Sequence, residues 1–234
     1  MKPFVVLDTE TAPEPNFDKN NMDKTSLVYD FGYVISDGEN ILRKRSFVIA
    51  ETFFNTELMQ SAYYADKLPQ YRAGLGADWQ VVSFFEAWTT FKADCKEFGV
   101  KDMFAYNARF DRNTLNHTIE HYSNGFVRWF FPYKMNVKDI WTMAGDTICN
   151  TKKYVKWCMS HGYVSPSGNP RTTAEAVYRY LMKDNEFVEA HTALDDAQIE
   201  EKILRKIRKR HQKASTNPNG SGWRKASKIA ENLQ

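Results

Sequence analysis

Apolar residues recur along this chain with two different periods, which predict an alternation of strands and helices. Short apolar runs at Phe4–Leu7, Leu27–Ile35 and Leu42–Ile49 are typical of buried strands. The first run stops at Asp8, as a buried strand does when it ends at a functional edge. Gly38 lies among polar residues between the other two runs and predicts a hairpin turn there.

The later segments follow the helical period more often. Apolar residues from Val81 to Phe98 step by three or four positions, and Gly99 then ends the predicted helix. Residues 51–80 show no clear period, although 53–64 fits a helix. Two short strands are expected at 102–106 and 135–137, and further helices at 112–122, 151–161, 172–182 and 196–212. The order β-β-β-α-β-α-β-α predicts an α/β fold with a mixed sheet of about five strands flanked by helices.

The length of 234 residues, with 42% hydrophobic and 15% aromatic residues, is enough for one large domain and an appendage. Residues 215–222 (STNPNGSG) have the composition of a linker. Beyond it, apolar residues from Trp223 to Leu233 recur at helical spacing, which fits a short helix docked on the body or on a partner. We therefore expect a domain at 1–213, followed by a flexible linker and a short basic C-terminal tail at 214–234.

Nothing in the sequence predicts a membrane or secreted protein. No stretch approaches the roughly 18 uncharged apolar residues of a membrane span, and acidic residues interrupt the N-terminal run where a signal peptide would stay apolar. The three cysteines, Cys95, Cys149 and Cys158, form no C-x-x-C motif and leave one unpaired under any pairing. This favours a reduced, cytoplasmic protein.

The net charge of +3 is unevenly distributed. Residues 197–234 carry ten lysines and arginines against three glutamates, a net charge of +7, which leaves −4 on residues 1–196. Such a basic end is either a solvated helix face or a surface that attracts phosphates. If Ile199, Ile203 and Ile207 face the core, the basic side chains of the same helix point outwards: Arg205, Lys206, Arg208, Lys209 and Arg210.

Three separated groups of residues carry the candidate chemistry. Asp8-Thr9-Glu10 ends the first strand, where side chains two residues apart share a face and can reach one metal ion. Asn107–Asp111 follows the strand at 102–106, with Phe110 available to anchor the turn in the core. His191–Asp196 leads into the last long helix. Each group alone has a simpler explanation, because D-x-E triplets occur by chance and Asp111 or Asp195 fits a helix N-cap.

In their order and separation, the three groups together resemble the DEDDh subclass of 3′–5′ exonucleases. This subclass belongs to the ribonuclease H-like superfamily and includes proofreading subunits, ribonuclease T and oligoribonuclease. Its third motif, H-x-A-x-x-D, is matched by His191, Ala193 and Asp196, and Thr192 argues against the related tyrosine subclass. The resemblance covers about residues 3–210 and implies a ribonuclease H-like sheet. The first motif departs from the common Thr-Gly continuation, because Thr11 is followed by alanine.

The resemblance implies a two-metal site. The carboxylates of Asp8, Glu10, Asp111 and Asp196 would hold two Mg²⁺ or Mn²⁺ ions, which prefer oxygen ligands. Asp8 would bridge the two ions, and Asp111 would hold the second ion through water. His191 would accept the proton of the attacking water as general base. Two such ions activate a water and stabilise the departing oxygen in phosphodiester hydrolysis.

The expected activity is removal of nucleoside 5′-monophosphates from the 3′ ends of single-stranded nucleic acid. The resemblance, and a tail that could bind a replication partner, favour DNA. An exonuclease that trims RNA is the alternative, because the choice between DNA and RNA depends on contacts near the 2′-hydroxyl. Contacts to the substrate are implied for Thr9, Thr11, Asn107 and Phe110. The alternative of another class is a non-catalytic nucleic-acid-binding module, against which the complete set of acids argues.

Two other metal motifs have weaker support. His117–His121 spells H-x-x-E-H, the inverted zinc-protease motif, for which Glu189 would be a third ligand. A solvated helix face explains it more simply. Cys149, Cys158 and His161 lack a fourth neighbour for zinc. The sequence contains no Walker loop and no G-x-S-x-G, so nucleotide-driven motors and serine hydrolases gain no support.

Overall fold

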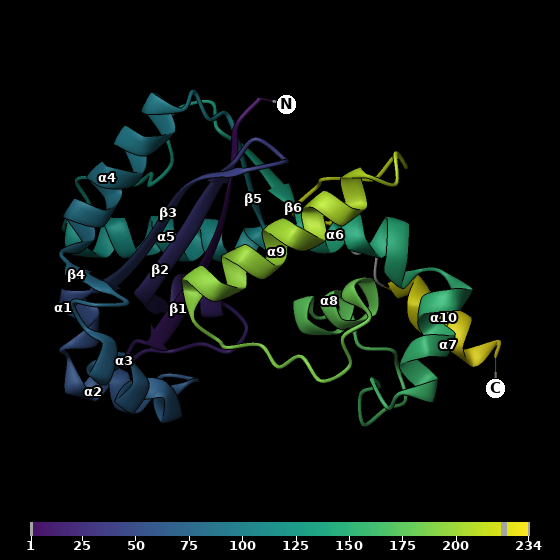
Figure 1. The fold of residues 1–234 in the computed structure, drawn as a ribbon. Helices are drawn as coiled ribbons and strands as arrows, with labels where there is room; N and C mark the ends of the chain where they lie inside the picture. Colours follow the sequence, from purple (N-terminus) through teal and green to yellow (C-terminus); the bar gives the residue numbers. More distant parts are fainter. Residues whose placement is uncertain (1, 221–223, 234) are drawn as a thin grey trace.

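A mixed sheet forms the centre of the protein, in a computed structural model that describes residues 2–220 and 224–233 (Figure 1). The strands are β1 (Phe4–Pro13), β2 (Ser26–Ser36), β3 (Ile41–Ile49), β4 (Gln80–Val82), β5 (Asp102–Ala105) and β6 (Asn136–Asp139). They form a six-stranded sheet in the order β4-β3-β2-β1-β5-β6. β2 is antiparallel to both of its neighbours, whereas β5 is parallel to β1 and to β6. The α/β class is confirmed, and β4 is a strand beyond the five expected.

Helices cover both faces of this sheet. They are α1 (Ala50–Phe53), α2 (Thr56–Gln60), α3 (Leu68–Gly74), α4 (Phe84–Glu97), α5 (Ala108–Tyr122), α6 (Ile140–Ala144), α7 (Lys152–Ser160), α8 (Ala174–Met182), α9 (Ala193–Arg208) and α10 (Arg224–Glu231). In Figure 1, α9 crosses one face of the sheet and α5 lies behind it. None of the described helices is long and apolar enough to cross a membrane.

The alternation of side chains along β1 creates two separate cores. Val5 and Leu7 point into a cluster with side chains of α4 and α5. Phe4 and Val6 point to the opposite face and pack against α9, whose Ile199, Ile203 and Ile207 line that cluster as their spacing predicts. A third cluster lies under α1–α3. The sheet is therefore held rigidly between α5 and α9, the two helices that carry the predicted catalytic motifs.

β1 does not stop at Asp8, as the apolar run suggested, but continues to Pro13. Beyond Leu7 the strand stays paired with β2, where Asp8 faces Gly32 and Glu10 faces Asp30. The register shifts between Glu10 and Thr11, which marks a bulge. A bulge of this kind changes the direction of side chains next to it.

Both helices that carry the predicted catalytic motifs begin earlier than their patterns suggested. α5 begins at Ala108, after Asn107 in the left-handed region (φ 72°), so Asp111 lies in the first turn and is not the N-cap. α9 begins at Ala193 and ends at Arg208, instead of covering 196–212, and Asp195 is likewise inside the first turn. The simpler explanation of Asp111 and Asp195 as N-caps therefore does not hold, because the N-cap residues are Asn107 and Thr192.

The C-terminal residues pack on the body. The backbone of Thr216 accepts a hydrogen bond from the N–H of Asp139 (3.1 Å). Further on, Ala226 and Ala230 of α10 are buried against Val155 of α7. The expected helix is therefore docked on the body, while Trp223 lies outside the described residues. A domain boundary at 213/214 stays a prediction.

The basic end of α9 is only partly turned to solvent. Lys206, Lys209 and Arg210 are exposed, as predicted. Arg208 is not: its guanidinium lies over the rings of Phe4 (4.3 Å) and Phe104 (4.8 Å). Phe4 begins β1, whereas Glu10 lies towards its other end, and α9 advances about 18 Å from Asp196 to Arg208. The basic end of α9 is therefore remote from Glu10 and Asp196.

Candidate active site

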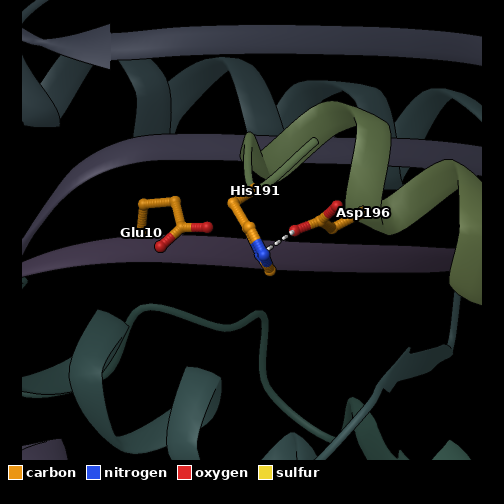
Figure 2. A group of neighbouring side chains, drawn as sticks. All are labelled: Glu10, His191 and Asp196. Atoms are coloured by element: carbon orange, nitrogen blue, oxygen red, sulfur yellow. Dashed lines mark ion pairs between the residues drawn. The ribbon is translucent and has the colours of Figure 1, made fainter. Parts of the chain in front are cut away.

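Three of the predicted catalytic residues meet where β1 passes the start of α9. Glu10, His191 and Asp196 each offer a ligand atom, and these atoms all lie within 4.8 Å of one another. Figure 2 shows Glu10 and Asp196 on either side of the imidazole of His191. The Nδ1 atom of His191 is 4.0 Å from an oxygen of Asp196. Among the described residues, this is the group with the spacing of metal ligands.

Asp8 and Asp111 join the same cluster through their charges. Burial raises the pKa of Asp8 well above its usual value, and the charges of Asp111, Glu200, Glu10 and Asp196 raise it further. Asp111 is buried and accepts a hydrogen bond from the Thr9 hydroxyl at 2.9 Å. The structure therefore brings together all four predicted carboxylates, although Asp8 and Asp111 lie outside the compact trio.

The crowding of these carboxyls determines their protonation. Burial, then the charge of Asp196, raises the pKa of Glu10 to about 10. Burial, then Glu189, raises that of Asp196 to about 9. Burial raises the pKa of Asp111 to about 7, although the bond from Thr9 opposes the rise. Carboxyls that face one another in a buried site hold protons at neutral pH unless a cation neutralises them.

The donor set fits divalent cations. Oδ1 of Asp196 is buried and has no hydrogen-bond partner among the described residues, although buried carboxylate oxygens are normally satisfied. The remaining candidate ligands are carboxylate oxygens, which magnesium and manganese prefer. A cation here would satisfy the unpartnered oxygen of Asp196 and offset the burial and repulsion that raise the pKa values.

The start of α9 is fixed by a buried aspartate of β2. Asp30 accepts hydrogen bonds from the backbone N–H of Ala193 (2.9 Å) and from the hydroxyl of Tyr71 (2.5 Å). Next to it, Gly32 lets the helix approach, because a Cβ at that position would lie 2.1 Å from the backbone nitrogen of Leu194. Asp30 and Gly32 thereby hold the turn that carries His191 and Asp196 against the sheet.

The start of α5 is fixed by Asp139 at the end of β6. Its carboxylate caps α6 by accepting the N–H of Thr142 at 3.0 Å. Hydrogen bonds from the backbone of Asn107 and Ala108 also lower its pKa, although burial outweighs them and raises the value to about 6. β6 extends to Asp139, beyond the predicted 135–137. One side chain therefore anchors the turn that presents Asp111.

The predicted substrate residues occupy two positions. Thr9 is buried and donates to Asp111, and Thr11 follows the bulge in β1. Asn107 and Phe110 line a surface depression of about 150 Å³ at the start of α5. Phe110 is half-buried there and does not anchor the turn in the core. The roles of these four residues in binding stay predictions.

Sequence reasoning missed three neighbours of the site. Glu200, one helical turn after Asp196, is buried and accepts the N–H of Tyr106 at 3.0 Å. Glu189 lies 3.9 Å from Nδ1 of His191, and burial raises its pKa to about 7. The ring of Tyr64 stacks on His191. The i, i+4 spacing from Asp196 was a usable signal for Glu200, whereas nothing in the sequence pointed to Tyr64.

The H-x-x-E-H segment forms a different cluster. His117 Nε2 lies 2.5 Å from one oxygen of Glu14, and His121 Nδ1 lies 3.2 Å from the other. Glu189 contacts His191 instead of these two histidines. Glu189 therefore cannot serve as the third ligand of a zinc site at His117 and His121.

Comparisons with known proteins identify the fold. No family model matches the sequence, and a search of curated proteins also finds no match. Among solved structures, E. coli exonuclease I with a dA16 oligonucleotide superimposes with a TM-score of 0.58 at 13% identity, over 100% of this chain and 43% of that chain. This chain thus spans less than half the length of exonuclease I.

Two smaller structures match over most of their own length. The nuclease domain of 3′hExo, a DEDDh family member bound to rAMP, gives a TM-score of 0.58 at 14% identity, over 92% of this chain and 96% of that chain. A 3′-exonuclease that recognises the histone mRNA stem-loop gives 0.59 at 12% identity, over 92% and 85%. The fold expected from the motifs is confirmed: this chain has the α/β fold of DEDDh-like 3′–5′ exonucleases.

Proposed function

We propose that this protein is a metal-dependent 3′–5′ exonuclease that releases nucleoside 5′-monophosphates from single-stranded ends. The observation that carries the proposal is the convergence of Glu10, His191 and Asp196 from distant parts of the chain. After burial, the charges of Asp111, Glu10 and Asp196 raise the pKa of Asp8, so these carboxyls are close enough to affect one another. A fold shared with solved exonucleases supports this assignment, and a binding module without catalysis has no need for these acids.

The carboxylates of Asp8, Glu10, Asp111 and Asp196 would hold two divalent ions, Mg²⁺ or Mn²⁺. Such ions lower the pKa of water and neutralise charge that develops on a phosphodiester. The protein itself contributes the positions of these ligands. Asp30 and Asp139 fix the two helix starts, so the ligands are held in place before substrate arrives. Preorganisation of this kind is a major source of catalytic power.

His191 is proposed as the general base. Burial, and then the positive charge of Lys67, lower its pKa below the usual value of about 6.5. The imidazole is therefore neutral at physiological pH and able to accept a proton from an attacking water. After cleavage, the same imidazole returns the proton to solvent from its half-exposed position.

DNA is the favoured substrate and RNA the second candidate. The match to exonuclease I with an oligodeoxynucleotide covers the whole of this chain, which supports DNA. The matches to an exonuclease of histone mRNA and to a domain with bound rAMP support RNA. A cytoplasmic location and a replication partner for the C-terminal tail are further proposals, and they rest on the sequence alone.

The test uses matched DNA and RNA oligonucleotides labelled at the 5′ end. Wild-type protein with Mg²⁺ or Mn²⁺ should shorten them one nucleotide at a time and release 5′-monophosphates. A chelator, Asp8→Ala or Asp196→Ala should abolish turnover without unfolding the protein. Covalently closed single-stranded circles should resist. Turnover that persists in the chelator would refute the metal mechanism, and rapid cutting of circles would make the enzyme an endonuclease.

A further inference from the structure

A second surface feature lies on the outer side of α5. It is a groove of about 960 Å³ between α5 and the loop of residues 129–137, which we call the α5 groove. Three cations line it, Lys24, Arg112 and Lys134, and no acidic side chain does so among the described residues. A groove lined by one sign of charge attracts polyanions.

Two aromatic rings of the α5 groove face solvent. Trp129 is 73% exposed and Tyr133 is 90% exposed. Exposed aromatic rings in a basic groove offer faces on which unpaired bases can stack. The exposed pair and the three cations together match the two requirements of a single strand, which are stacking and neutralisation of phosphates.

The loop that carries these rings is anchored between them. Phe130 is fully buried, and its backbone N–H donates to Oδ1 of Asn116 on α5 at 2.8 Å. Its carbonyl accepts the indole N–H of Trp88 on α4 at 2.6 Å. Because Phe130 fixes the loop in the core, the rings of Trp129 and Tyr133 are displayed from an anchored position, which lowers the entropy cost of binding.

The α5 groove lies next to the turn that carries Asp111, on the outer side of the helix. Arg109, Arg112 and Asn116 recur at three- and four-residue spacing, so they share one face of α5. Arg109 lines the small depression with Asn107 and Phe110, whereas the other two line the α5 groove. Asp111 lies within this first turn of the helix. From Arg109 to Asn116 the helix advances about 10 Å, so the depression lined by the predicted substrate residues Asn107 and Phe110 lies beside the groove on this face of α5.

We propose that the α5 groove binds the single strand upstream of its 3′ end, with bases stacked on Trp129 and Tyr133 and phosphates near Lys24 and Arg112. The inference rests on the proposed function, because it gives the path of that enzyme's substrate. It predicts a length dependence. A dinucleotide reaches only the metal site, while a strand of about 12 nucleotides also fills the groove, within the range of about 4–16 nucleotides for known single-strand sites.

The experiment compares binding and cleavage in the full chain. Binding of a fluorescent dT strand of about 12 nucleotides is measured with calcium in place of magnesium, and cleavage of a dinucleotide is measured with magnesium. Trp129→Ala and Tyr133→Ala should each weaken binding of the long strand about tenfold, the usual loss for a stacked base. Lys24→Gln should reduce the slope of log affinity against log salt by about 0.7, the value for one phosphate of a single strand.

Matched variants separate this groove from general effects. Phe126→Ala removes a 92% exposed ring that lies three residues before the loop and does not line the groove. Lys153→Gln removes an exposed charge on α7, beside a separate depression of about 360 Å³. Both should bind the long strand as wild type does.

Equal losses in the controls, or unchanged binding in Trp129→Ala and Tyr133→Ala, would overturn the inference and leave the groove to another partner. Failure of the proposed function looks different, because wild type would then cleave neither the dinucleotide nor the long strand. Circular dichroism of each variant shows that a loss of binding is not a loss of fold.

Discussion

The ring of Tyr64 lies flat against the imidazole of His191, with ring centroids 4.4 Å apart and planes inclined by 14°. Tyr64 comes from the segment between β3 and β4, which shows no clear sequence period. Tyr71 of the same segment donates to Asp30, the residue that holds the start of α9. The segment therefore supports both the imidazole and the turn that carries it.

We expect removal of this stacked ring to lower turnover. Tyr64→Ala removes the ring that holds the imidazole of His191, whose backbone has an unusual φ of 55°. The imidazole then loses its orientation, and kcat should fall about tenfold. This is a part of the roughly 10²–10⁴-fold that a positioned base contributes to the rate. Tyr64→Phe keeps the stacked ring and should retain activity. The control is Tyr63→Ala, since Tyr63 is 83% exposed and meets only the edge of Tyr64. Single-turnover rates of the three variants decide, and a normal rate in Tyr64→Ala would refute a positioning role.

The second prediction concerns the acidic limb of the pH–rate profile. Because burial and Lys67 lower the pKa of His191, the imidazole stays neutral to a pH below about 6.5, and the rate should fall only below that value. His191→Ala should lose roughly 10²–10⁴-fold at neutral pH. Lys67→Gln removes the positive charge, so the pKa of His191 should rise and the limb should move to higher pH. A limb that does not move in Lys67→Gln would assign it to another group.

The apolar pattern predicted most of the framework, because strands and helices of the sheet are long enough to show their period. It missed β4, α3 and α6, at three, seven and five residues, which are too short for either period to recur clearly. The helix starts were misplaced for a physical reason. Asp30 of β2 accepts a hydrogen bond from the backbone at the start of α9, and Asp139 of β6 does the same at the start of α5. Because these acceptors are far from the helices in the sequence, they leave no local signal.

The sequence predicted those residues of the candidate site that belong to its three motifs. His191, Glu10 and Asp196 meet as expected. Tyr64 and Glu189 were not foreseen, because their contacts with His191 depend on how an irregular segment and a loop fold over the site. The prediction that Arg208 points outwards was wrong, because its guanidinium packs over the rings of Phe4 and Phe104. The spacing of the isoleucines in α9 carries no information about these two rings.

The third prediction is that the metal-free protein loses stability as pH rises. Burial and neighbouring charges raise the pKa of Glu10 from 4.5 to about 10 and that of Asp196 from 3.8 to about 9. Between about pH 4 and pH 9 the unfolded chain has released these protons while the fold retains them. The free energy of unfolding must then fall with increasing pH. Divalent cations should reverse the loss, since they bind the ionised carboxylates of the folded state.

Asp196→Asn tests this linkage, because the amide is neutral at every pH. In a chelator, the variant should have a higher Tm than wild type at pH 8, and the difference should close towards pH 4. The exposed Glu57→Gln is the matched control and should follow wild type. Thermal unfolding at several pH values is sufficient. A wild-type Tm that rises from pH 5 to pH 8 in the chelator would contradict the raised pKa values.

The last prediction separates two neighbouring cations at the end of α9. Arg208 covers the rings of Phe4 and Phe104, so Arg208→Ala should lower the free energy of unfolding by about 1–2 kcal/mol through lost packing and cation–π contact. Lys209 is exposed and lies about 20 Å along the helix from Asp196. Lys209→Glu should therefore leave both stability and the salt dependence of single-strand binding unchanged. Chemical denaturation and salt titrations measure the two effects. If Lys209→Glu instead flattens the salt slope by about 0.7 or more, the strand passes over the end of α9, and the basic C-terminal end is part of the substrate path.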